Sequence, residues 1–279
     1  MELVSYLIAP FHHVFMLKAL AISALVGLVC SALSCFMILK GWALMGDAVS
    51  HAVMPGVVLA YVFKLPLALG AFIFGLASVW AIGFIQAQTR VKEDTVIGIV
   101  FTGFFAFGLI LVSKIRSSLD LIHILFGNVL GISQQDLIQT GIISVITLVT
   151  IGLLRKDLLL FCFDPIHARS IGLNTNFLYY TLLSLLSLTA VAGLQTVGII
   201  LVVAMLITPG ATAYLLCDRF DSMMAIAVLS GVFSSVAGTY LSYYLDGSTG
   251  GCIVVLQTLL FVLAMIFAPK HGLLAKSKS

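Results

Sequence analysis

The sequence predicts an all-α integral membrane protein, a polytopic bundle of about eight (eight or nine) transmembrane segments with a short cytoplasmic coupling helix. The chain of 279 residues is 61% hydrophobic and only 9% charged. Its mean hydropathy of +1.20 is far above that of soluble domains. Long apolar runs separated by short polar breaks exclude a β-barrel, whose strands alternate apolar and polar residues.

The candidate membrane segments follow one another along the whole chain. They are 15–39, 49–63, 67–88, 95–113, 137–154, 178–194, 197–216, 223–245 and 252–268. A spanning helix needs about 20 residues, and about 17 is tolerated. Segment 49–63 is short and contains Pro55-Gly56, so we expect a broken, re-entrant or steeply packed element there, covered by protein or water. Only residues 195 and 196 separate segments 178–194 and 197–216, so one of these two segments is a second candidate for irregular structure.

The apolar segments leave no room for a soluble domain, so residues 1–279 are expected to form a single transmembrane domain. The longest polar stretches are 114–136 and 155–177, and a basic tail occupies 270–279. The first apolar run is long enough to span the membrane and no small-residue cleavage site follows it. We therefore expect no cleaved signal peptide.

The basic residues predict how the bundle is oriented, because cytoplasmic loops carry an excess of Lys and Arg. Ten of the fourteen are assigned to the cytoplasm: Lys40, Arg90, Lys92, Arg155, Lys156, Arg169, Arg219, Lys270, Lys276 and Lys278. Lys18, Lys64, Lys114 and Arg116 are left outside. The C-terminus is then cytoplasmic. Nine spans would place the N-terminus outside and eight would place it inside, and the sequence leaves both open.

Asp47 and His51 are the candidate metal ligands. They lie at the start of the short segment, in residues 46–56, and are four residues apart. On a helix this spacing places both side chains on one face, where a carboxylate and an imidazole suit a first-row divalent cation. An ionisable residue in lipid is costly unless it has a partner, a water-filled cavity or an ion. The alternative is that Asp47 caps a helix starting near Ala48 and that His51 bonds a backbone carbonyl.

A second polar motif predicts a two-turn helix in a cytoplasmic loop. Asp164 is a good N-cap, Pro165 suits the first turn, and Gly172 suits a left-handed C-cap. Such a helix is too short and polar to span. It is either a simple link between two spans or a docking site for another protein.

Several other residues have a structural explanation and a functional one. Glu93 and Asp94 begin a segment and complement its helix dipole, with contact to a cytoplasmic partner as the alternative. Pro209 is expected to kink its helix, either for packing or as a gate.

Three histidines and the cysteines carry weaker signals. We expect structural roles rather than metal binding for His12, His13 and His123. The five cysteines form no C-x-x-C pair, and we interpret them as small apolar residues within helices.

Catalytic signatures are missing from the sequence. The chain contains no Gly-Lys dipeptide and hence no Walker A loop, and neither H-E-x-x-H nor G-x-S-x-G occurs. The chain is therefore expected not to be an enzyme. If ATP drives it, the nucleotide site is on another subunit.

Five ordered motifs resemble the membrane permease subunit of manganese, zinc and chelated-iron ABC importers. These motifs are residues 46–56, 92–106, 123–128, 163–173 and 197–210. The similarity runs from about residue 5 to about residue 274 and covers nearly the whole chain. The motif around His123 is most similar to the manganese and iron branch.

The resemblance implies partners and roles for particular residues. It implies a dimer of permeases (two copies, or this chain with a close homologue), cytoplasmic ATPase subunits and an extracytoplasmic metal-binding protein. The family's metal-pathway residues fall on Asp47 and His51. Its coupling segment falls on Asp164 to Gly172, through Pro165, Ala168 and Arg169. This chain departs from the family in carrying Ile166 and His167 where an acidic and an aromatic residue are common.

These observations predict an importer of a divalent transition metal in the membrane of a bacterium, with manganese or iron favoured and zinc possible. The metal is cargo, and no tightly bound cofactor or nucleic acid is expected. Two other transporters remain as alternatives: a proton-coupled secondary metal transporter working through His51, and an ABC permease for a metal chelate. A structural scaffold would leave the intramembrane Asp47 and His51 unexplained.

Overall fold

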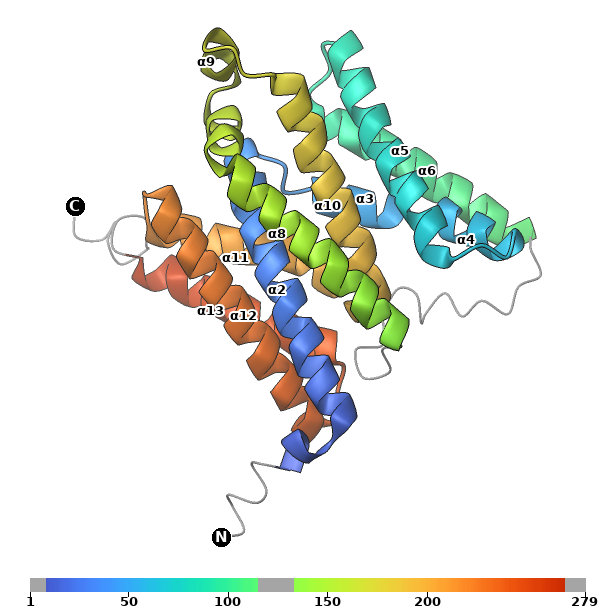
Figure 1. The fold of residues 1–279 in the computed structure, drawn as a ribbon, viewed down its shortest axis with the longest axis vertical. Helices are drawn as coiled ribbons and strands as arrows, with labels where there is room; N and C mark the ends of the chain where they lie inside the picture. Colours follow the sequence, from blue (N-terminus) through green and yellow to red (C-terminus); the bar gives the residue numbers. More distant parts are fainter. Residues whose placement is uncertain (1–8, 115–132, 269–279) are drawn as a thin grey trace.

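A computed structural model describes residues 9–114 and 133–268, and every regular element in these two ranges is helical (Figure 1). The elements are η1 (Ala9–His12), α2 (Val14–Lys40), α3 (Met45–Ala52), α4 (Met54–Val62), α5 (Leu67–Gln88), α6 (Glu93–Lys114), α8 (Gln134–Phe163), α9 (Pro165–Ser170), α10 (Thr175–Val197), α11 (Ile199–Leu216), α12 (Phe220–Leu245) and α13 (Thr249–Phe267). The predicted all-α membrane architecture is confirmed.

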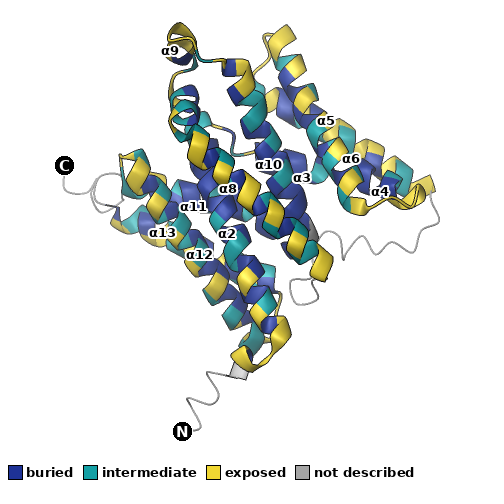
Figure 2. Cartoon of the chain, viewed as in Figure 1, coloured by how far each residue is buried: buried dark blue, intermediate teal, exposed yellow. Residues whose placement is uncertain are grey.

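The N-terminal helix α2 forms the centre of the bundle. It packs against α8, α11 and α12, and its side chains Leu33, Phe36 and Met37 are almost completely buried. In Figure 2, α2 and α3 are mainly buried, whereas α5, α8 and α12 each show an exposed stripe. These stripes include exposed apolar side chains such as Trp80 of α5 and Leu153 of α8, which suit contact with the hydrocarbon of a bilayer.

Small residues allow the central helices to approach one another closely. A Cβ atom added to Gly231 would overlap Ser31 Oγ, and one added to Gly27 would overlap Ser235 Oγ. On α11, a Cβ at Gly210 would come within 2.7 Å of the carbonyl oxygen of Ser34. Helices in lipid associate through such close packing. The small residues of α12 therefore serve contacts inside this chain.

The short segment around Pro55 is broken, as predicted. Helix α3 ends at Ala52 and α4 begins at Met54, so the chain changes helix at Val53. Pro55 lies in the first turn of α4, where its missing N–H would have no helical partner in any case. Helices α5, α6 and α10 pack around the pair, which gives the break the protein cover that a bilayer demands.

In the described ranges, nine helical units are long and apolar enough to cross a membrane, with α3 and α4 together forming one of them. This count agrees with the nine-span alternative, in which the two ends of the chain lie on opposite sides. The predicted irregularity after residue 194 is a change of helix at Gly198, whose φ of +88° favours glycine. Helix α11 continues through Pro209 to Leu216.

Substituting Gly56 tests the crossing of α4 and α5. A Cβ at Gly56 would overlap the carbonyl oxygen of Gly70 and come within 2.9 Å of Phe74 Cβ. Because backbone atoms cannot move aside cheaply, we expect Gly56→Ala to destabilise the protein by about 1–3 kcal/mol. Thermal unfolding of the purified protein measures this.

The matched control is Gly98→Ala on α6, where an added Cβ meets no atom within 4 Å. Alanine is the better helix former, so this variant should be as stable as the parent or slightly more stable. Equal unfolding temperatures for Gly56→Ala and Gly98→Ala would contradict the close crossing of α4 and α5.

Candidate metal-transport site

Asp47 and His51 lie on α3, in its first and last turns. The helix is wedged between α6, α10 and α11, and its residues Met45, Val49 and Ala52 are completely buried. The opposite face carries the two polar side chains, of which Asp47 is 41% exposed and His51 is 24% exposed. The local sequence thus buries one side of α3 and leaves a carboxylate and an imidazole accessible on the other.

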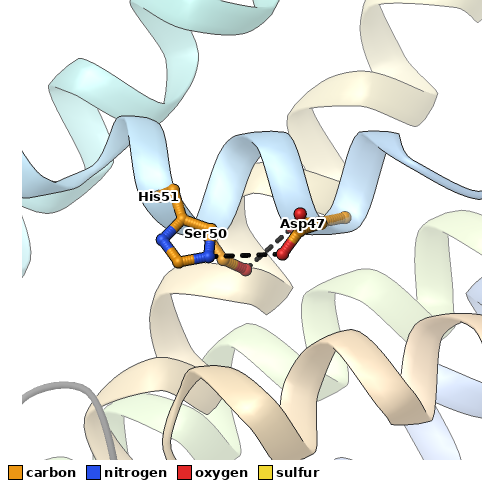
Figure 3. Close-up of polar contacts among 4 residues, drawn as sticks. Asp47, Ser50 and His51 are labelled. Carbon is orange, nitrogen blue, oxygen red and sulfur yellow. Dashed lines mark hydrogen bonds and ion pairs between the residues drawn. The ribbon is translucent and has the colours of Figure 1, made fainter. Parts of the chain in front are cut away.

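The two side chains meet, as the i,i+4 spacing predicts. His51 Nε2 is 3.3 Å from Asp47 Oδ1 (Figure 3). Between them, Ser50 Oγ donates to the backbone carbonyl of Gly46 at 2.8 Å and does not compete for Asp47. A carboxylate and an imidazole that meet inside a membrane protein can together coordinate a cation. The cation would then replace the contact between the two side chains.

Aromatic rings from α6 enclose the imidazole. The ring centres of Phe101 and Phe105 are each 5.4 Å from that of His51. Its second nitrogen, Nδ1, is buried and has no hydrogen-bond partner among the described residues. One nitrogen of His51 is therefore directed to Asp47, and the other is shielded from water.

The alternative, in which Asp47 is a helix cap, is wrong for this structure. Helix α3 begins at Met45, upstream of Asp47, and its N-cap Leu44 makes no side-chain capping bond. No hydrogen bond joins His51 to a carbonyl of the described chain either. Neither side chain is used by the backbone, so the pair is free for ligand chemistry.

The donor set on this chain is one oxygen and one nitrogen. Structural zinc sites use four protein ligands, and within residues 9–114 and 133–268 there is no group of three or more His, Cys, Asp or Glu side chains that could hold a metal. Two donors with open positions suit a cation that binds and leaves, which transport requires.

The other candidate residues are dispersed. Glu93 and Asp94 lie in the first turn of α6, as expected from the helix dipole. His12 and His13 are exposed at the N-terminal end of α2, where the His13 ring stacks on Phe15 at 5.3 Å. His123 lies outside the described residues.

The predicted short helix after Asp164 is present as α9. The Asp164 carboxylate accepts hydrogen bonds from the backbone N–H groups of Ile166 (3.0 Å) and His167 (2.9 Å). Pro165 is in the first turn, and Gly172 has a φ of +90° after the last turn. The N–H of Leu173 then returns to the carbonyl of Ala168 at 3.1 Å, which closes the C-terminus. Figure 1 shows α9 projecting from the top of the bundle, at the end of α8.

The side chains of this segment face in different directions. Ala168 is completely buried, and Arg169 Nη2 donates to Thr175 Oγ1 at 3.4 Å, which ties α9 to the start of α10. Two apolar side chains are also strongly exposed: Phe163 is 79% exposed and Ile166 is 80% exposed. In the sequence, Ile166 is notable only as a departure from the family pattern. The exposure of these two side chains was not predicted, because an apolar residue carries no signal of its burial.

A helical membrane protein with a broken helix that carries an acid–imidazole pair, and a short capped helix that projects from the bundle, has the features of a transport permease. The chain belongs to the ABC 3 transport family, whose model matches residues 12–268.

Individual relatives cover nearly the whole chain. It is 64% identical to the manganese transport system membrane protein MntB of Synechocystis sp. (97% of this chain, 89% of the relative). It is 53% identical to the chelated iron transport system membrane protein YfeD of Yersinia pestis (95% and 89%). Among solved structures, it is similar to PsaBC from Streptococcus pneumoniae in complex with Fab, with a TM-score of 0.87 and 39% identity over 99% of this chain and 100% of that chain.

Proposed function

We propose that this chain is the multi-pass inner-membrane permease of a bacterial ATP-driven importer, and that it carries a divalent transition metal into the cytoplasm. The observation that carries the proposal is the contact between Asp47 and His51 on a broken, protein-covered helix. Family membership and the manganese and iron systems named among the relatives support manganese or iron as cargo.

Partners would complete both the site and the motor. A second permease copy facing this one across a shared pore would contribute its own Asp and His and raise the donors to four. The chain carries no nucleotide-binding loop, so ATP would be hydrolysed on a separate cytoplasmic subunit. An extracytoplasmic metal-binding protein would deliver the ion.

The structure offers a route by which ATP binding would reach the pore. Helix α9 follows α8 after the single residue Asp164, so a displacement of α9 acts directly on the end of α8. Helix α8 packs against both α2 and α10, and α10 contacts α3, which carries Asp47 and His51. The free energy for reorienting the site would come from different contacts of α9 with the two states of the ATPase.

The rival transport mechanisms are less well supported. A proton-coupled transporter would need no docking helix, whereas α9 is capped at both ends and projects from the bundle. A metal chelate would need a wide cavity, whereas Phe101 and Phe105 enclose His51 closely.

Uptake of manganese, ferrous iron and zinc, each offered separately, tests the proposal. A strain lacking this chain and a complemented strain are compared, with ATP depletion and a protonophore as separate treatments. We expect complementation to restore manganese or iron uptake that requires ATP and survives the protonophore. Restored uptake that survives ATP depletion but is lost with the protonophore would support the proton-coupled alternative and reject ours.

A further inference from the structure

An apolar cavity of about 520 Å³ lies beside the coupling segment, at the ends of four helices. Its walls include Leu39 of α2, Leu160 and Phe163 of α8, Tyr214 of α11 and Phe220 of α12. Cys217, in the turn between α11 and α12, also lines it. Its volume is within the range of about 300–1,000 Å³ that is usual for ligand pockets. None of the contacts that form the Asp47–His51 site involves these residues.

Charged residues mark where the hydrocarbon layer ends on this side of the bundle. Arg155 of α8 pairs with Asp221 of α12, and Lys156 follows at the rim of the cavity. Charges are costly in hydrocarbon, so this level corresponds to the membrane boundary. Phe163 lies eight residues further along α8, roughly 12 Å at 1.5 Å per residue. The headgroup layer is only about 5–8 Å thick on each side, so the outer end of the cavity lies beyond the lipid.

The cavity is continuous with the surface of α9. Phe163 lines it and immediately precedes Asp164, the N-cap of α9, and Ile166 is exposed on the first turn of that helix. Apolar surface exposed to water and bordered by polar residues marks a protein contact. The rim carries Lys156 and Asp218, one charge of each sign. An apolar centre within a polar rim is the usual anatomy of an interface hot spot.

We propose that this cavity is a second docking point for the ATPase subunit, which inserts an apolar side chain between α8 and the α11–α12 turn. The inference rests on the proposed function, because it requires a cytoplasmic ATPase. Docking at α9 alone would act on the end of α8 and the start of α10. An inserted side chain also contacts α11 and α12. The ATPase would then contact both α8 and α12, the two helices that the Arg155–Asp221 pair joins.

Cys217 is a native reporter for this cavity. It is partly exposed, whereas Cys30, Cys35 and Cys162 are buried. Burial, and next the nearby Asp218, raise the pKa of the Cys217 thiol, so its labelling should accelerate as the pH rises. Cys252 is the other partly exposed cysteine in the described ranges and is replaced in a Cys252→Ser background. Cys217→Ser in the same background is the control for labelling elsewhere.

The test measures the rate at which a fluorescent maleimide labels Cys217 in the purified permease, in detergent and in phospholipid nanodiscs, with and without the ATPase. We expect bound ATPase to slow labelling at least tenfold in both media. An unchanged rate in a complex shown by co-purification to contain the ATPase would overturn the docking point and leave the proposed function intact. Slow labelling in nanodiscs without ATPase, relieved in detergent, would identify lipid as the occupant and also overturn it. Failure of any ATPase to co-purify would count against the proposed function itself.

Discussion

Replacing Asp47 or His51 by alanine should reduce metal accumulation at least tenfold and leave the protein folded in the membrane. Changing a residue that only supports a metal ligand typically lowers affinity about 10–100-fold, so removing one of two donors on this chain should do at least as much. Asp47 is 41% exposed, and its side-chain contact is with His51, so the packing of α3 should survive its loss. Uptake of radioactive manganese or iron, normalised to the amount of protein in the membrane, measures the effect.

Ser50→Ala is the matched control for these two variants. Ser50 lies between Asp47 and His51 on α3, but its hydroxyl is buried and bonded to the carbonyl of Gly46. Its loss removes a local hydrogen bond and no proposed ligand, so uptake should remain close to that of the parent. Normal uptake by both Asp47→Ala and His51→Ala would rule out the site, and equal losses in all three variants would indicate damage to α3 instead.

Replacing Ile166 by lysine should have the second large effect, a loss of ATPase binding and of metal uptake. Ile166 is 80% exposed on α9, and the described residues leave most of its apolar surface uncovered. Burying such a side chain against a partner stabilises the contact by about 1.5–3 kcal/mol, which corresponds to about tenfold to hundredfold in affinity. A buried ammonium group without a partner would weaken the contact further. The measurements are co-purification of the ATPase and metal uptake.

Ile166→Leu separates apolar contact from damage to the helix. Leucine keeps an apolar side chain of similar size at the same position, and the Asp164 cap that holds α9 is unchanged. We expect this variant to retain ATPase binding and transport. If Ile166→Lys bound the ATPase and transported metal normally, α9 would have no docking role through this side chain.

Local patterns explain why much of the molecule could be predicted. Hydropathy located the spans, because a helix in lipid must be apolar over a fixed length. Pro55 indicated the break after Ala52, because proline donates no backbone hydrogen bond. The cap at Asp164 and the turn at Gly172 were recognisable because capping depends on neighbours within a few residues.

The sequence by itself therefore determined the helical membrane class, the broken helix, the facing pair Asp47 and His51, and the capped helix α9. The tertiary structure decided which neighbours these features have. It placed Phe101 and Phe105 on the imidazole and left Phe163 and Ile166 exposed. It also opened a cavity between helix ends that are far apart in the chain. Helical periodicity and capping act over a few residues, whereas burial and cavities depend on how distant segments pack.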